Sequence, residues 1–177
     1  MKARSFSHVG LTVSNFNRFV QYYSDVFGCR LVGVADHPAE RVRTFFGIEG
    51  AVSLKVGWVR VPGGGILEIF EFNPQLPPAP IPWNRVGLTH FSFNVRNTHK
   101  WHEYLISKGV EIVTKPERSP RGQWFFFVRD FDGNLIELID LGFMHYVLGW
   151  GGALGGWLFR RGMYKRYYTD TPAASGL

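Results

Sequence analysis

The chain has 177 residues, 45% hydrophobic and 19% charged, a balance that excludes a disordered chain and suits one domain or two small fused modules. Its formal charge of +6 favours anionic partners, but the basic residues are scattered outside a cluster at 160–166, and no nucleic-acid-binding motif accompanies them. We therefore expect a small-molecule partner and no nucleic acid.

The only cysteine, Cys29, excludes an internal disulfide framework and every multi-cysteine zinc motif. A single cysteine also fits a reducing compartment. Residues 1–7 lead into the first predicted strand and show no long apolar core or cleavage site. On these grounds we expect a cytoplasmic protein.

The pattern of the first half predicts a βαβββ module. Residues 6–13 alternate between apolar and small or polar side chains, as a half-buried strand does. Ser14 or Asn15 caps a helix that runs to about Phe27, with Gly28 as its stop. Residues 35–43 are interpreted as a polar loop that belongs to a lid. The remaining strands are expected over residues 29–34, 52–61 and 66–72, the last two joined by a glycine-rich hairpin.

Residues 73–82 contain five of the ten prolines, which excludes regular structure there and indicates a linker. After it, the order of elements repeats. The predicted fold is therefore α+β, with tandem βαβββ modules at residues 1–73 and 86–141 and a linker at 74–85. The elements of the second module are a strand over 87–95, a helix from Asn97 or Thr98 to about Lys108, and strands over 111–114, 124–129 and 135–139.

A Gly/aromatic-rich C-terminal extension, residues 142–177, has no counterpart in either module. Residues 141–159 carry no formal charge, yet six of these nineteen residues are glycine, which disfavours a membrane-spanning helix. We favour a lid or subunit contact for the extension. An interfacial membrane segment and a flexible extension are the alternatives.

Each module begins with a histidine strand and ends with a glutamate strand. The ligand candidates are His8 and Glu68 in the first module and His90 and Glu137 in the second. Alternation places His8 on the small, polar face of its strand, as the wall of a cleft requires. If both sheets curve around one cavity, the four side chains converge there. We expect Glu71, by contrast, to be an exposed strand residue.

Imidazole nitrogen and carboxylate oxygen are donors that suit Zn, Ni, Co, Mn or Fe(II), so the four residues predict a site for one divalent metal ion. Such an ion polarises a carbonyl oxygen and stabilises the enolate formed when a neighbouring C–H is deprotonated. Glu137 or Glu68 is the candidate for the base that takes and returns this proton.

These features together resemble the vicinal oxygen chelate superfamily, which includes glyoxalase I, methylmalonyl-CoA epimerase, extradiol dioxygenases and the fosfomycin and bleomycin resistance proteins. The resemblance covers residues 6–140. It implies paired βαβββ modules forming a curved mixed sheet around a divalent metal. The segments that carry it are the His8 strand with its helix ending at Phe27-Gly28, and residues 65–68, 88–90 and 129–138.

Glu68 resembles the fourth ligand of the glyoxalase and epimerase pattern. This likeness favours a metal-dependent isomerase, epimerase or lyase that abstracts a proton next to a metal-bound carbonyl. Phe70, Phe72 and the aromatic run 124–127 further suggest an aromatic or apolar substrate.

Two other functions stay open. An Fe(II)-dependent ring-cleaving dioxygenase would use His8, His90 and Glu137 and would not require Glu68. A drug-binding protein of the bleomycin-resistance kind would use the aromatic cleft without catalysis. We expect a homodimer, and the superfamily allows the metal site to lie within one chain or to be shared between two.

Overall fold

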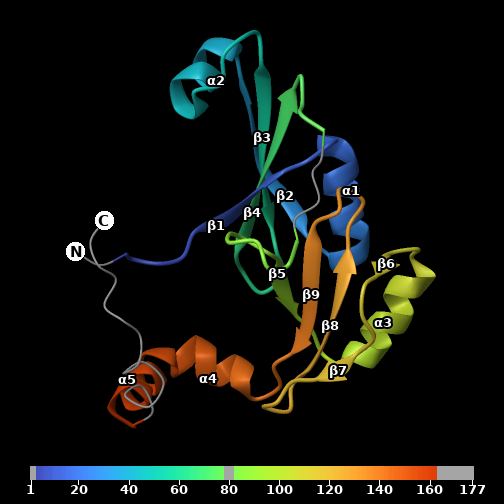
Figure 1. The fold of residues 1–177 in the computed structure, drawn as a ribbon, viewed down its shortest axis with the longest axis vertical. Helices are drawn as coiled ribbons and strands as arrows, with labels where there is room; N and C mark the ends of the chain where they lie inside the picture. Colours follow the sequence, from blue (N-terminus) through green and yellow to red (C-terminus); the bar gives the residue numbers. More distant parts are fainter. Residues whose placement is uncertain (1–2, 78–81, 163–177) are drawn as a thin grey trace. The chain divides into compact units, whose positions relative to one another are not determined.

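The computed structural model describes residues 3–77 and 82–162 of the chain (Figure 1). Two compact units are present. The first comprises Met1–Thr89, Lys108–Val110 and Arg129–Asn134, and the second comprises His90–Ser107, Glu111–Val128 and Leu135–Leu177. Each unit is built on one sheet with a helix against it, which confirms the predicted α+β class.

The sheet of the first unit has four strands in the spatial order β1-β4-β3-β2. Strands β1 and β4, the first and last along the chain, pair in parallel, whereas β3 runs antiparallel to both of its neighbours. The hairpin expected between the last two strands is confirmed. The four strands are β1 (His8–Thr12), β2 (Arg30–His37), β3 (Ser53–Arg60) and β4 (Ile66–Asn73).

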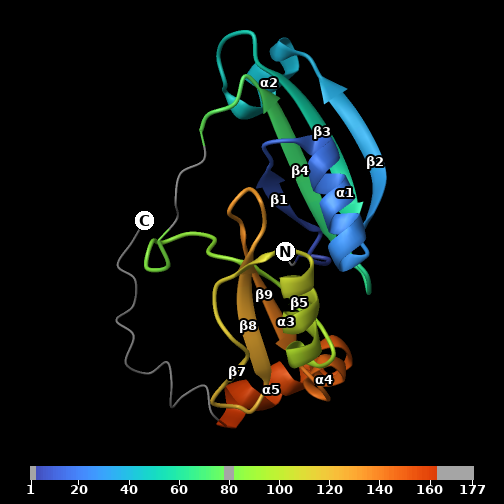
Figure 2. The same cartoon turned by 90° about the vertical axis from the view of Figure 1, so that its right-hand side faces the viewer.

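Helix α1 (Phe16–Phe27) packs on one face of this sheet (Figure 2). It begins where predicted, because the Asn15 side chain accepts a hydrogen bond of 2.8 Å from the Arg18 backbone N–H. It ends at Gly28, whose φ of 71° supplies the left-handed cap. Its buried side is Phe16, Phe19, Tyr23, Val26 and Phe27.

The prediction of a loop over residues 35–43 is wrong. Strand β2 continues to His37, which pairs with Leu54, and helix α2 (Ala39–Phe46) follows directly after Pro38. The helix is held by Val42, which is fully buried in a cluster with Val52, Leu54 and Val56. Only one side chain of this polar helix is buried, so the hydrophobic pattern is too weak to predict it from the sequence.

Helices α1 and α2 cover opposite faces of the sheet. A Cβ atom on Gly57 would lie 2.5 Å from the Phe16 ring, so α1 lies directly on the face to which Gly57 belongs. Leu54 and Val56 alternate with that position and pack against Val42 of α2. Glu68 lies on the α2 side of the sheet, because its cross-strand partner is Trp58, two residues from Val56.

The sheet of the second unit repeats the arrangement of the first, with the spatial order β5-β9-β8-β6. Strands β5 and β9, the first and last along the chain, pair in parallel. Helix α3 (Thr98–Ser107) packs against it through Leu105, which is fully buried. The first strand is shorter than the predicted 87–95, and β7, which pairs with β8, was not expected. The strands are β5 (Phe91–Asn94), β6 (Glu111–Ile112), β7 (Glu117–Arg118), β8 (Trp124–Arg129) and β9 (Leu135–Asp140).

The extension continues as two short helices, α4 (Met144–Trp150) and α5 (Gly152–Gly162). Within the described residues, no helix combines the length and the apolar character needed to cross a bilayer. The rest of the predicted extension, 163–177, lies outside the described residues, as do positions 78–81 of the predicted linker.

The turn between β8 and β9 is anchored on α1 by a buried carboxylate. Asp130 is only 4% exposed and accepts four hydrogen bonds. One comes from the Tyr23 hydroxyl of α1 at 2.8 Å, and the others come from Asp132 and Asn134 within the turn. Asp132 in addition accepts hydrogen bonds from the Ser14 N–H and hydroxyl. These contacts hold the turn that introduces β9.

Burial of Asp130 leads to a prediction about pH. Burial raises the pKa of this carboxyl above 3.8, although its hydrogen bonds oppose the shift. A carboxyl group whose pKa is higher in the folded state than in the unfolded state stabilises the fold at pH values below its ordinary pKa. This stabilisation is lost as pH rises through the pKa of the folded state. The amide that Asp130→Asn introduces does not titrate in this range. We therefore expect the free energy of unfolding of wild type, minus that of Asp130→Asn, to fall as pH rises above about 4.

Urea unfolding at a series of pH values measures this difference. Asp25→Asn, at an exposed position of α1, is the matched control for the loss of one carboxylate. A difference between wild type and Asp130→Asn that stays constant with pH would contradict the prediction.

Candidate metal centre

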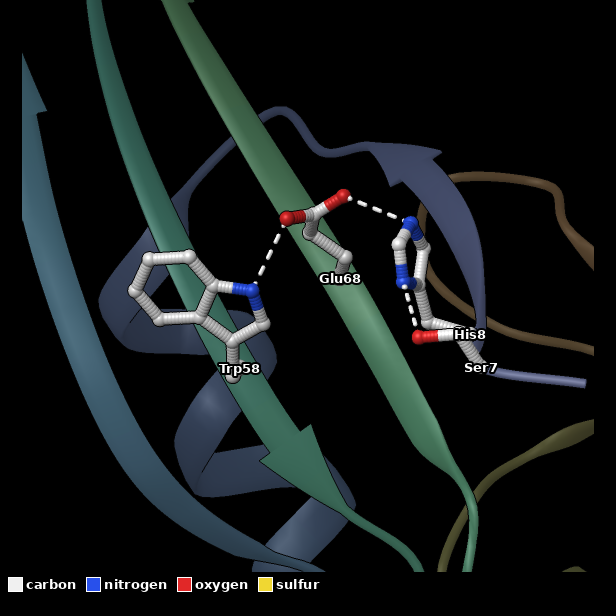
Figure 3. Close-up of polar contacts among 4 residues, drawn as sticks. All are labelled: Ser7, His8, Trp58 and Glu68. Carbon is white, nitrogen blue, oxygen red and sulfur yellow. Dashed lines mark hydrogen bonds and ion pairs between the residues drawn. The ribbon is translucent and has the colours of Figure 1, made fainter. Parts of the chain in front are cut away.

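His8 and Glu68 form a close pair on adjacent parallel strands of the first unit (Figure 3). In the register of β1 and β4, His8 is level with Ile66 and Gly10 is level with Glu68. Glu68 therefore lies two residues beyond His8, on the same face of the sheet. The His8 Nε2 and Glu68 Oε2 atoms are 3.0 Å apart.

Two further side chains contact this pair from opposite ends (Figure 3). The Ser7 hydroxyl lies 3.0 Å from His8 Nδ1, so the ring nitrogen that faces away from Glu68 has a polar partner. The Trp58 indole N–H donates a hydrogen bond of 2.8 Å to Glu68 Oε1. The result is a linear chain from Ser7 through His8 and Glu68 to Trp58.

The sequence did not predict the contact between Trp58 and Glu68. The predicted hairpin, with strands 52–61 and 66–72, would pair Val61 with Ile66 and therefore Val59 with Glu68. The structure pairs Arg60 with Ile66 and Trp58 with Glu68, one residue away from the predicted register. Directly paired side chains lie on the same face of an antiparallel sheet, so this register places the indole beside Glu68.

His90 and Glu137 repeat the arrangement in the second unit. Phe91 pairs with Ile136 and Ser92 with Glu137, so Glu137 again lies two residues beyond the position level with the histidine. Here the His90 Nε2 and Glu137 Oε2 atoms are 3.8 Å apart, and the His90 ring stands edge-on to Phe127. The two modules thus place the same residue pair in the same register.

Both pairs are accessible to a ligand. The His8 and His90 side chains are 42% and 31% exposed, and each glutamate side chain is 18% exposed. The histidines are therefore open to solvent, while the carboxylates lie deeper against their sheets.

In each module a second carboxylate follows the candidate glutamate ligand by three residues and anchors the helix of that module. Glu71 Oε1 accepts a hydrogen bond of 2.9 Å from the Phe16 N–H, at the start of α1. Asp140 Oδ2 accepts one of 2.9 Å from the Asn97 N–H, just before α3. The expectation that Glu71 is simply an exposed residue is wrong, because a carboxylate at a helix N-terminus satisfies a free N–H and the helix dipole.

The donor set suits a divalent metal. Each pair offers one imidazole nitrogen and one carboxylate oxygen, which are ligands for Zn, Ni, Co, Mn or Fe(II). Burial raises the pKa of the Cys29 thiol to about 11, so a thiolate does not add to this set at neutral pH. Across residues 3–77 and 82–162, no group of three or more His, Cys, Asp or Glu side chains is close enough to hold a metal. The structure therefore brings the four candidates together in pairs, one in each unit.

Aromatic rings line the face of the first sheet next to Glu68. Phe70 and Phe72 stack with their ring centroids 6.4 Å apart, and Phe46 of α2 stands edge-on to both. Gly10 leaves room for this wall, since a Cβ atom there would lie 3.2 Å from the Phe70 ring. The predicted aromatic surface beside the glutamate strand is thus present in the first module.

Comparison with known proteins identifies the family. The profile of the Glyoxalase/Bleomycin resistance protein/Dioxygenase superfamily matches residues 5–138. The chain belongs to this superfamily. A lactoylglutathione lyase from Arabidopsis thaliana is 26% identical over 140 residues, covering 78% of this chain and 45% of the relative. A 2-epi-5-epi-valiolone epimerase from Actinomyces sp is 24% identical over 143 residues, covering 76% of this chain and 78% of the relative.

The chain spans about half the length of the lactoylglutathione lyases that it matches. Among solved structures, a glyoxalase family protein from Bacillus cereus superimposes with a TM-score of 0.67 at 20% identity, covering 79% of this chain and 95% of that one. This likeness shows that the chain has the glyoxalase fold.

The helix anchors can be tested by mutation. We expect Glu71→Ala and Asp140→Ala each to lower the free energy of unfolding by about 1 kcal/mol, since each removes a charged acceptor from a helix N-terminus. Glu49→Ala, at an exposed position outside the helices, is the control and should have little effect. Chemical denaturation measures all three, and equal stability of Glu71→Ala and Glu49→Ala would refute an anchoring role for Glu71.

Proposed function

We propose that His8, Glu68, His90 and Glu137 hold one divalent metal ion, Zn, Ni, Co or Mn, and that the protein is a lyase, isomerase or epimerase of the glyoxalase type. The observation that carries this proposal is the repeated register, which places one histidine and one glutamate side by side in each module. An unselected pair would not be expected to recur with the same offset in both. The superfamily membership and the lyase and epimerase relatives support the same class of reaction.

When bound, the metal would act as a Lewis acid toward a carbonyl oxygen of the substrate. The proposed reaction is a proton shift at the neighbouring carbon, and a glutamate is the base that takes the proton and returns it.

The two glutamates differ in their freedom to act as this base. Both oxygens of Glu68 have a partner, with Oε1 bonded to Trp58 and Oε2 facing His8. The Glu137 carboxylate has one polar neighbour in the described part of the chain, His90 Nε2 at 3.8 Å. A base must turn toward the substrate, so we assign the proton transfer to Glu137 and a fixed ligand role to Glu68.

The proposed substrate is a small carbonyl compound with an apolar or aromatic part. The wall formed by Phe46, Phe70 and Phe72 beside Glu68 supports this choice. The basic character of the chain favours an anionic group on the substrate.

Proton exchange with solvent tests the reaction. The metal-loaded protein is incubated in deuterium oxide with lactoylglutathione and with aromatic α-hydroxyketones, and deuterium at the carbon next to the carbonyl is followed by NMR. We expect incorporation by wild type and a loss of about 10²–10⁴-fold in Glu137→Gln. Glu103→Gln, at an exposed position on α3, is the matched control and should behave as wild type.

Metal content distinguishes the alternatives. About one Zn, Ni, Co or Mn per chain in wild type, weakened in Glu68→Ala, supports the four-ligand proposal. Iron retained equally by both proteins, together with oxygen uptake on a catechol, would favour the ring-cleaving dioxygenase. Absence of metal in both after reconstitution would leave a binding protein and would overturn the proposal.

A further inference from the structure

We propose that Trp58 is a positioning residue for Glu68, a role that rests on the function proposed above. The indole N–H takes one carboxylate oxygen, so the other oxygen remains directed at His8. The contact is visible in Figure 3, where Glu68 lies between the indole and the imidazole. Trp58 thereby determines which oxygen of Glu68 is available to a metal.

Two sets of neighbours contact the indole. One is Gly33 of the edge strand β2, where a Cβ atom would be 3.0 Å from the Trp58 ring. The register between β2 and β3 is irregular between Leu31 and Gly33, and Gly33 is level with Trp58. The other is the buried cluster of Val42, Val52, Leu54 and Val56, against which Trp58 packs. A side chain at position 33 would therefore displace the indole from its observed position.

A hydrogen bond to the ligand carboxylate restricts the rotation of that carboxylate before the metal arrives, as the partners of metal-ligating side chains commonly do. Loss of such a partner typically lowers metal affinity about 10–100-fold.

The test is a titration of Ni and of Zn into the metal-free protein, measured by calorimetry against a competing chelator. Trp58→Phe keeps a ring in the cluster but removes the donor, and we expect its affinity to fall about 10–100-fold. Gly33→Ala keeps the indole but displaces it, and should lower the affinity in the same direction. Trp101→Phe, on α3, is the matched control and should bind as wild type.

Folding of each variant is checked by thermal unfolding before titration. Wild-type affinity in Trp58→Phe, with reduced affinity in Glu68→Gln, would overturn the positioning role and leave the metal site intact. A wild type that binds no metal would remove the proposed function and the positioning role together.

Helices α4 and α5 of the extension expose apolar side chains, and we infer that they form a docking surface for anionic lipid headgroups. Large apolar side chains are exposed there, with Leu148 57%, Leu154 63% and Trp157 50% accessible. On α5, Leu154, Trp157, Leu158 and Arg161 follow the i, i+3, i+4, i+7 spacing of a single helix face. This apolar face has no covering partner among the described residues.

Charge determines which partner fits this face. Residues 141–162 contain two basic residues and no acidic one, namely Arg160 and Arg161. The Arg161 guanidinium lies 4.4 Å from the centre of the Trp157 ring, which places a cation beside an aromatic residue of the apolar face. A second copy of this chain would bring the same positive charge, whereas an anionic lipid surface complements it.

The geometry suits binding at the surface of a bilayer. Helix α5 has 11 residues and is about 16 Å long, roughly half of the hydrocarbon thickness. Tryptophan and tyrosine favour the interface between lipid and water, and basic residues favour the headgroups of anionic lipids. We therefore expect α5 to lie along the membrane surface with Trp157 inserted among the headgroups.

Vesicle co-sedimentation tests this surface, with phosphatidylcholine vesicles compared with vesicles containing about one third phosphatidylglycerol. We expect binding to the anionic vesicles only, weakened by salt, with a blue shift of tryptophan fluorescence. Arg160→Ala combined with Arg161→Ala should weaken binding about 30-fold. Trp157→Ala should also weaken it, whereas Phe45→Ala, which removes an exposed aromatic residue on α2, should not.

The lipid assignment would be overturned if wild type bound both kinds of vesicle equally or bound neither. In the second case, a dimer in analytical ultracentrifugation that dissociates in Trp157→Ala would identify a second copy as the partner.

Discussion

The parallel pairing between the first and last strand of each module is the constraint on which both histidine–glutamate pairs depend. Side chains alternate along a strand, so a shift of one residue in either pairing would turn the glutamate to the opposite face of its sheet. The observed register places Glu68 and Glu137 two residues beyond their histidines. Glu71 on β4 and Asp140 on β9 each accept a hydrogen bond from a backbone N–H at the start of a helix. These bonds help to fix the two strands that carry Glu68 and Glu137.

The two pairs share a register but differ in their surroundings. Glu68 is engaged at both oxygens, by Trp58 and His8, whereas Glu137 faces His90 at a longer distance. A carboxylate with two partners is restricted, and one with a single distant partner can turn. This difference is the physical basis for giving the two glutamates different roles, although both have the same two-residue offset from their histidine.

The sequence predicted the elements whose signals are local and strong. Helix α1 has a side-chain cap at Asn15, five buried apolar residues at helical spacing and a glycine stop, and its bounds were confirmed. Helix α2 was missed, because Val42 is its only buried residue and the surrounding residues are polar or exposed. The carboxylate of Asp130 was missed as well, since its burial depends on Tyr23, 107 residues away in the chain.

The sequence by itself determined the family, the bounds of helix α1 and the faces on which His8, Glu68, His90 and Glu137 lie, because alternation and turn residues are local properties of the chain. Only the tertiary structure decided that the Trp58 indole reaches Glu68. That contact requires the β3–β4 register and the space left by Gly33 on a third strand. Contacts between residues distant in sequence depend on how strands pack together, and hydrophobic periodicity carries no information about that packing.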